Sequence, residues 1–173
     1  MKTRLVVTVA APDRPGIVDE LSSIIAASNA NWEESRLANL AGMFAGVLLV
    51  GVEADRASEL ADNLRKVSDK DISVMVREAP PETKGANAVA LRLHLTGADH
   101  EGIIHGFSSF LAKQGVNVER VRTEIVNAPY SGGPLFKARF LISCPPSLAV
   151  VDLHDRLREL AEDLAVDIEL GPA

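Results

Sequence analysis

An internal duplication constrains the fold of this chain more than any other feature of its sequence. Over most of two long segments, residues that lie 86 positions apart are identical or similar in chemical character. Asp13 corresponds to Asp99, and Gly16 corresponds to Gly102. An apolar stripe at helical spacing repeats as well: Ile17, Val18, Leu21, Ile24 and Ile25 match Ile103, Ile104, Phe107, Phe110 and Leu111. Because chance rarely reproduces such a stripe together with the turn before it, the chain contains two copies of one structural unit.

Each copy predicts the order strand, helix, strand, strand, helix, strand. In the first copy, apolar patterns indicate strands at 5–9, 31–40, 43–52 and 72–76, and helices at 17–27 and 57–67. The first helix of each copy is predicted to stop at Asn29 or Gly115, the residue types that best tolerate a positive φ. The second copy repeats this order, with a longer loop at 127–134 that adds six residues.

Four strands and two helices in this order form a four-stranded antiparallel sheet with both helices on one face. The predicted fold class is therefore α+β, with two βαββαβ units in tandem. The first unit is assigned to residues 1–78 and the second to residues 89–173. Residues 79–88 contain two prolines and a glycine but no apolar run, and they are predicted to form a linker.

The sheet face opposite the helices is expected to be partly apolar. The strand residues assigned to it are Val6, Leu48, Val50, Met75 and Leu141. Such side chains are too apolar for a fully solvated surface, so the sheets or their edges are expected to be covered by the other unit or by a second chain. A homo-oligomer is therefore the expected state.

The charge and the cysteine content exclude several classes of protein. The net charge is −6 and the pI is about 5.2, which argues against direct binding to nucleic acid or to an anionic membrane, because both require a basic face. A single cysteine excludes an intrachain disulfide framework and fits a reducing cytosol. The first apolar run ends too early for a signal peptide, and no run is long enough to span a bilayer. We therefore expect a cytoplasmic protein without a membrane partner.

No group of residues predicts catalysis or metal binding. Cys144 ends an apolar strand and precedes two prolines, so it is interpreted as a small buried residue and not as a nucleophile. The four histidines lack the spacing of a zinc motif, and no glycine-rich phosphate loop is present. At 18.5 kDa, two such units leave little room for a catalytic domain. We expect no enzymatic activity, no metal and no cofactor.

The two strand-to-helix turns are the candidate functional positions. In the first turn, Asp13 is predicted to cap the helix with its side chain, Pro15 to occupy the first helical turn, and Gly16 to leave room beside the backbone. The unpaired N–H groups of such a helix start suit a small anion such as a carboxylate. Aliphatic side chains beside these donors, with an aspartate to accept an ammonium group, suit a free amino acid. The candidate ligand-binding residues are Asp13, Arg14, Pro15, Gly16, Ile17 and Val18 in the first unit and Asp99, His100, Gly102 and Ile103 in the second.

The first turn also resembles a known family. The strand, the run Asp-Arg-Pro-Gly-Ile-Val from Asp13 to Val18, the helix and then Asn31 before the next strand resemble the ACT domain, a small-molecule-sensing module. Two such domains without an attached enzyme resemble the glycine cleavage system transcriptional repressor family over almost the whole chain. The resemblance implies a ferredoxin-like fold, side-by-side pairing of units, and amino-acid binding near the first strand–helix loop at the unit interface. It also implies a regulator that contacts a DNA-binding activator, with glycine as the suspected effector.

The second turn departs from this pattern. His100 and Glu101 stand where the first unit has Arg14 and Pro15. Glu101 suits the positive end of the helix dipole, but it would repel a bound carboxylate. The first turn is therefore the preferred site, and the second unit is expected either to be structural or to bind differently.

Three functions fit these observations. The leading hypothesis is a non-enzymatic, amino-acid-sensing regulatory protein that acts on glycine cleavage transcription through protein contact. The alternative is a regulatory subunit of an enzyme of amino-acid metabolism, because paired domains of this kind also serve enzymes. The third is a dimerisation module without a ligand.

Overall fold

The computed structural model describes residues 1–67, 71–80, 88–127 and 133–173. The chain divides into two compact units, Met1–Thr83 and Lys84–Ala173. This division falls within the predicted linker, of which residues 81–87 lie outside the described residues. Most of the predicted long loop at 127–134 lies outside them as well.

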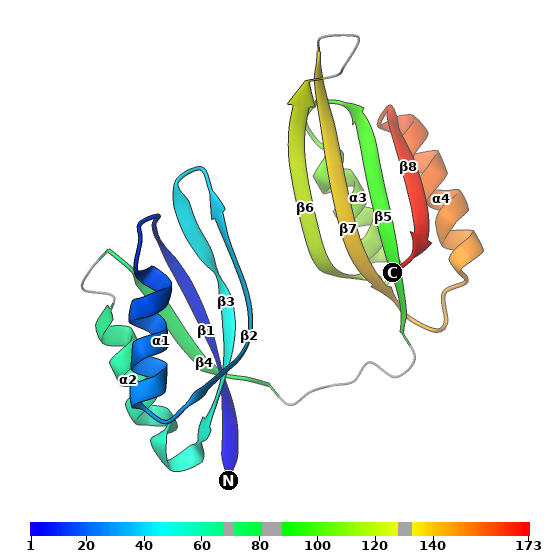
Figure 1. Cartoon of the computed structure of the whole chain (residues 1–173). Coiled ribbons are helices and arrows are strands. Elements are labelled where there is room, and N and C mark those ends of the chain that lie inside the picture. The colour runs from blue at the N-terminus through cyan, green and yellow to red at the C-terminus, as the bar shows by residue number, and fades with distance from the viewer. Residues whose placement is uncertain (68–70, 81–87, 128–132) are drawn as a thin grey trace. The chain divides into compact units, whose positions relative to one another are not determined.

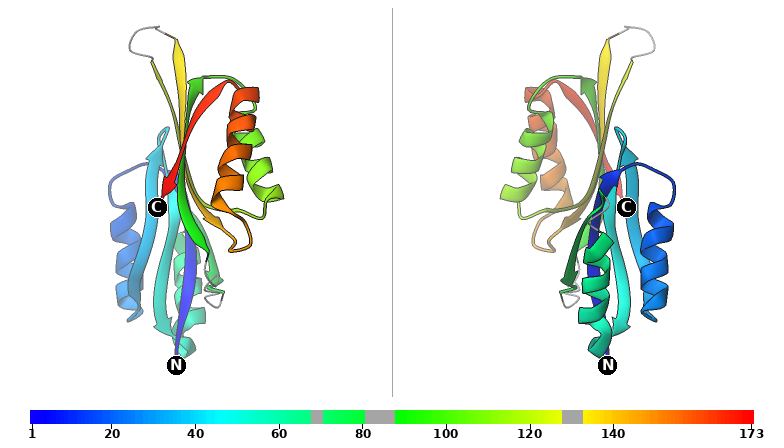
Figure 2. Two further views of the ribbon diagram at one scale, coloured as in Figure 1. Left: turned by 90° about the vertical axis from the view of Figure 1, so that its right-hand side faces the viewer. Right: turned by 90° about the vertical axis from the view of Figure 1, so that its left-hand side faces the viewer.

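The first unit has the predicted order of strands and helices (Figure 1). Its elements are β1 (Lys2–Pro12), α1 (Ile17–Ala27), β2 (Asn31–Leu40), β3 (Met43–Glu53), the short 3₁₀ helix η1 (Ala54–Arg56), α2 (Ala57–Arg65) and β4 (Ser73–Glu78). The strands form an antiparallel sheet in the order β2-β3-β1-β4. Both helices lie on one face of this sheet, and the other face carries no helix (Figure 2).

The second unit repeats this architecture. Its elements are β5 (Val89–Ala98), α3 (Ile103–Lys113), β6 (Asn117–Asn127), β7 (Pro134–Cys144), α4 (Val150–Asp163) and β8 (Val166–Pro172). The strand order is β6-β7-β5-β8, which corresponds strand for strand to the first sheet. Again both helices cover one face (Figure 2). The predicted α+β fold, with two ferredoxin-like units in tandem, is therefore confirmed.

Each unit is held together by its own apolar core between sheet and helices, aliphatic in the first unit and with three phenylalanines in the second. Alternate residues of β1 and the stripe of α1 meet there, and all are at most 5% exposed: Leu5, Val7, Val9, Ile17, Leu21 and Ile25. The corresponding residues of the second unit are buried to the same extent: Leu91, Leu93, Leu95, Ile103, Phe107 and Leu111. Two separate clusters, one in each unit, contain these side chains.

The assignment of the open sheet face was partly wrong. Leu48 and Val50 are 1% and 0% exposed and belong to the core. In β3 they lie opposite Val7 and Leu5, and residues directly opposite one another in an antiparallel pair share a face. A slip of one residue along β3 changes the face, so the open face carries the half-buried Leu49 instead.

The ends of the first helices agree with the sequence. Asn29 has a φ of 51° and Gly115 a φ of 69°, both in the left-handed region. One edge strand of each sheet also contains an extra residue at the same position of the repeat, Glu33 in β2 and Glu119 in β6, where the pairing register shifts. The two units thus share a bulge as well as an element order.

Candidate functional site

In the first unit, the chain reverses between β1 and α1 through a left-handed turn at Gly16. Gly16 has a φ of 96° and directly precedes the first helical residue, Ile17. For a residue with a Cβ, this backbone conformation would cost about 1–2 kcal/mol relative to the right-handed one. Crowding is not the reason for glycine, because the nearest atom to a Cβ built here, Arg14 Nη1, is 3.9 Å away.

Asp13 does not cap α1, contrary to the prediction. Its side-chain Oδ2 accepts a hydrogen bond from Asn39 Nδ2, and its N–H donates to the Gly42 carbonyl at 2.8 Å. Both partners belong to the β2–β3 hairpin. Since Gly16 takes the N-cap position, Asp13 lies too early in the chain to reach the N–H groups of the helix. Pro15 likewise precedes α1 and does not belong to its first turn.

Arg14 lies along the start of the helix. Its Nη2 contacts Glu20 Oε2 at 3.2 Å, and its Nη1 donates to the Pro15 carbonyl at 3.4 Å. The Arg14 and Glu20 side chains are 40% and 32% exposed, so water screens this ion pair. A carboxylate that entered the turn could therefore compete with Glu20 for the guanidinium.

An open depression of about 280 Å³ lies against this turn. Within the described residues no side chain caps α1, so the N–H groups of its first turn remain available. The depression combines these donors with one guanidinium, two carboxylates and apolar walls. Its lining residues are Asp13, Arg14, Gly16, Ile17, Val18, Asp19 and Phe44.

The equivalent turn of the second unit has the same backbone but different side-chain contacts. Gly102 has a φ of 93° at the N-cap of α3. The His100 ring lies between two backbone carbonyls, with Nδ1 2.9 Å from the Glu101 oxygen and Nε2 2.8 Å from the Leu164 oxygen. The Asp99 N–H donates to the Pro134 carbonyl at 3.2 Å, as Asp13 does to Gly42. His100 therefore ties this turn to the connection between α4 and β8.

These contacts raise the pKa of His100. The Leu164 carbonyl is the largest cause, followed by the Glu101 carbonyl and by the charge of Asp99, while desolvation acts in the opposite direction. A neutral imidazole has one N–H and can donate to one of the two carbonyls, whereas the imidazolium donates to both. A histidine whose pKa is raised on folding stabilises the folded state fully below its unfolded pKa, and this contribution disappears as the pH rises through the folded pKa.

We therefore expect the stability difference between the wild type and His100→Ala to be larger at about pH 5 than at about pH 8. Denaturant unfolding of both proteins, followed by circular dichroism, measures this difference. His105→Ala removes a histidine from the exposed surface of α3 and serves as the control. A pH-independent difference for His100→Ala would contradict the bridge between the two carbonyls.

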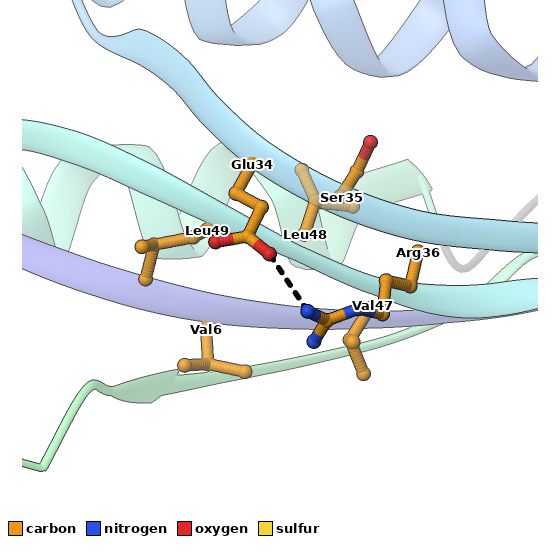
Figure 3. A pocket seen from close by; sticks show the side chains of 7 residues that line it. All are labelled: Val6, Glu34, Ser35, Arg36, Val47, Leu48 and Leu49. Atoms are coloured by element: carbon orange, nitrogen blue, oxygen red, sulfur yellow. Dashed lines mark ion pairs between the residues drawn. The ribbon is translucent and has the colours of Figure 1, made fainter. Parts of the chain in front are cut away.

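A second depression, of about 130 Å³, lies on the open face of the first sheet (Figure 3). Glu34 and Arg36 project over it from β2 and form an ion pair at 3.0 Å, beside Val6, Val47 and Leu49. Only strand residues line this depression, so it lacks the available N–H groups of a helix start, and it has fewer donors for a carboxylate than the turn at Gly16.

Other kinds of site find no support among the described residues. They contain no cluster of histidine, cysteine and acidic residues that could hold a metal ion. None of the helices within the described ranges is long and apolar enough to cross a membrane. Cys144 is 1% exposed, and burial raises the pKa of its thiol, as expected of a structural cysteine.

Comparison with known proteins identifies the family. A model described as "ACT domain" matches residues 3–77, which cover nearly all of the elements of the first unit. The UPF0237 protein MK1213 of Methanopyrus kandleri is 44% identical over 70 residues, which are 39% of this chain and 78% of that protein. The chain belongs to the ACT-domain family. The second ACT unit is recognised by its fold, because it repeats the first strand for strand.

Solved structures extend this likeness to the whole chain. A protein of unknown function from Galdieria sulphuraria is 30% identical, with a TM-score of 0.83 over 100% of this chain and 99% of that one. A candidate glycine cleavage system transcriptional repressor has a TM-score of 0.73 at 19% identity, over 99% of this chain and 97% of that one. At 19% identity, the similarity to this second structure shows a shared fold, with two ACT units in tandem, and nothing further.

The candidate residues predicted from the sequence include five of the seven that line the depression, but not Asp19 or Phe44. It also missed Asn39, the partner of Asp13. Asn39 lies two residues before the tight Ala41–Gly42 turn, where both residues have positive φ. This hairpin reaches the β1–α1 turn because β3 pairs with β1, which places Phe44 opposite Ala11. The local sequence does not contain this register.

Proposed function

We propose that this ACT-domain regulatory protein senses a free amino acid at the β1–α1 turn of its first unit and has no enzymatic activity. The depression of about 280 Å³ beside the uncapped first turn of α1 carries this proposal. Its size lies near the lower end of the range for small-molecule sites, which favours a small ligand.

The groups around this turn are complementary to a zwitterion. The N–H groups of Gly16, Ile17 and Val18, at the positive end of the α1 dipole, are placed to donate to a carboxylate. Arg14 adds a charged donor if the ligand displaces Glu20. The carboxylates of Asp13 and Asp19 both line the depression and are acceptors for an ammonium group.

The second unit is the weaker candidate for the same ligand. His100 is held by the Leu164 carbonyl, and Glu101 adds a negative charge to the turn. Both ring nitrogens of His100 face backbone carbonyls, so neither is free to donate to a ligand, and Glu101 would repel a carboxylate. Asp99, Gly102 and Ile103 keep the backbone arrangement of the first unit. We therefore propose one amino-acid site in each chain, formed by the first unit.

Glycine is the ligand we propose, and control of the glycine cleavage system through contact with a DNA-binding activator is the proposed role. The support is the small depression, the net charge of −6, which disfavours direct DNA binding, and the two-unit fold shared with a candidate repressor of that system. Pairing of units in a homo-oligomer would cover the apolar side chains of the first open face.

A screen of the twenty common amino acids by thermal unfolding tests the sensing role. Trp32 is the only tryptophan in the chain and packs against the core of the first unit, so its fluorescence reports the unfolding of that unit. An amino acid at a hundredfold excess over its Kd should stabilise the first unit by about 2.7 kcal/mol. We expect glycine to give this shift. If no amino acid shifts the transition, the sensing role is wrong.

A further inference from the structure

The open sheet faces of the two ACT units have diverged in charge. In the first unit the centre of this face is apolar, with Val6, Val47 and Leu49 side by side. The equivalent positions of the second unit are Arg92, Arg139 and Leu141. The same fold therefore presents an apolar surface in one copy and a cationic surface in the other.

The strand register places the basic side chains of the second unit in neighbouring rows. In one row, Arg92 on β5 and Arg120 on β6 flank Leu141 on β7. The backbones of neighbouring strands lie about 5 Å apart. In the next row, His94, Arg139 and Arg122 lie opposite one another. Lys137 follows in the third row, opposite Thr96. Most of the positive charge of this face is thus concentrated on β5, β6 and β7.

Three of these arginines have no ion-pair partner among the residues that the structure describes. Arg139 contacts Glu124 at 3.1 Å, and His94 lies 3.9 Å from Glu169. No such pair involves Arg92, Arg120 or Arg122, and all three are exposed. In the first unit the position of Arg120 is held by Glu34, which neutralises Arg36. In the second unit that position is an arginine. Glu124 pairs with Arg139, and the remaining arginines, Arg92, Arg120 and Arg122, repel one another unless an anionic group approaches.

We propose that the open face of the second unit, defined by Arg92, Arg120, Arg122, Arg139 and Leu141, binds an acidic segment of a partner protein. The three unpaired guanidinium groups supply bidentate donors for carboxylates. Leu141 is half-buried between Arg92 and Arg120 and provides an apolar contact for one side chain of the segment. These residues alternate along the strands with the core residues Leu93, Phe140 and Ile142, so they lie on the sheet face that the helices α3 and α4 do not cover (Figure 2). The proposal does not rest on the amino-acid site of the first unit.

The chemistry of the face favours an acidic polypeptide over a nucleic acid. Single-stranded nucleic acids bind sheet surfaces through aromatic side chains that stack on the bases. The described positions of this face carry no phenylalanine, tyrosine or tryptophan. The imidazole of His94 is the aromatic ring found among them, and it lies 3.9 Å from the carboxylate of Glu169. Asp167, Glu169 and Glu124 border it and would repel a continuous phosphate backbone, whereas a short segment can avoid them.

Fluorescence anisotropy on the full chain tests this proposal. The probe is a labelled peptide of aspartate and glutamate with one central leucine, and an oligothymidylate of equal length is the competitor. We expect the double variant Arg120→Glu/Arg122→Glu to weaken peptide binding about tenfold or more at low ionic strength. The control Lys113→Glu/Arg158→Glu makes the same change of charge on α3 and α4, at exposed positions, and should alter binding less than about threefold.

Three results would overturn the proposal. The first is that the wild-type protein does not bind the peptide. The second is an equal loss of binding in the two double variants, which would show attraction by net charge alone. The third is that the oligothymidylate binds more tightly than the peptide, which would make the face a nucleic-acid surface. Circular dichroism of each variant establishes that both units remain folded.

Discussion

Gly46→Ala is expected to destabilise the first ACT unit by about 3 kcal/mol or more, because the added methyl group would meet backbone atoms. A Cβ built at Gly46 overlaps the Arg36 carbonyl oxygen and lies 2.8 Å from the Leu37 Cα. Both atoms belong to β2, the neighbouring edge strand. A flexible side chain could rotate away from a new methyl group, but β2 must move as a whole and lose hydrogen bonds to β3.

The loss is large relative to the stability of a unit of this size, which is about 4–12 kcal/mol for roughly eighty residues. Denaturant unfolding followed by Trp32 fluorescence measures it directly, since Trp32 lies in β2 itself. The duplication supplies a matched control, because Ala138 occupies the equivalent position of β7 and is 1% exposed. Ala138→Gly should cost only about 1 kcal/mol, and in the second unit. A Gly46→Ala protein as stable as the wild type would show that β2 and β3 do not pair as described.

The repeat explains why the fold could be predicted from the sequence. One amphipathic pattern is weak evidence, but two copies, aligned by a shift of 86 residues before the six-residue insertion and 92 after it, agreed on each strand, each helix and the left-handed residues Asn29 and Gly115. These features depend on neighbours within a few positions along the chain, and local patterns report such features well.

The errors concern contacts between distant parts of the chain. Asp13 has the right residue type and the right position for a cap, but hydrogen bonds to the β2–β3 hairpin take its side chain and backbone. The placement of Leu48 and Val50 required the register between β1 and β3, and a shift of one residue reverses the face. No local pattern contains this register, because every residue from Leu48 to Val50 is apolar.

The residues of the candidate site also divide into those that the local sequence determines and those that depend on distant contacts. The left-handed glycines at the two helix starts, Gly16 and Gly102, follow from the local sequence. The contrast between the two turns does not, because it depends on the Leu164 carbonyl, which lies 64 residues after His100. The sequence predicted a difference between the turns from Glu101, and the structure adds His100 as a second cause.

Val18→Asp is expected to abolish amino-acid binding while leaving the first unit folded. Val18 lies in the first turn of α1, lines the depression and is 47% exposed, so its replacement leaves no cavity in the core. A carboxylate at this end of a helix stabilises the helix by about 0.3–1 kcal/mol. The same charge would repel a ligand carboxylate about 4 Å away by about 4 kcal/mol at an effective dielectric constant of about 20.

The prediction is therefore that the stabilisation by ligand, about 2.7 kcal/mol at a hundredfold excess over the wild-type Kd, disappears in Val18→Asp. Trp32 fluorescence during thermal unfolding measures both the stability of the unit without ligand and its response to the ligand. Val18→Asn has a similar shape without the charge and should retain most of the response. Ser23→Asp places the same charge on the exposed surface of α1 beyond the first turn and should retain all of it.

Together the three variants distinguish a loss of ligand binding from a loss of folding. A response that survives in Val18→Asp would place the ligand elsewhere in the chain, because no carboxylate could then lie against the start of α1. A response lost equally in Val18→Asp and Ser23→Asp would reflect net charge and not position. A carboxylate bound at the helix start predicts that the response to ligand is lost in Val18→Asp alone, while the stability without ligand stays the same or rises. Helix stability and ligand binding then change in opposite directions.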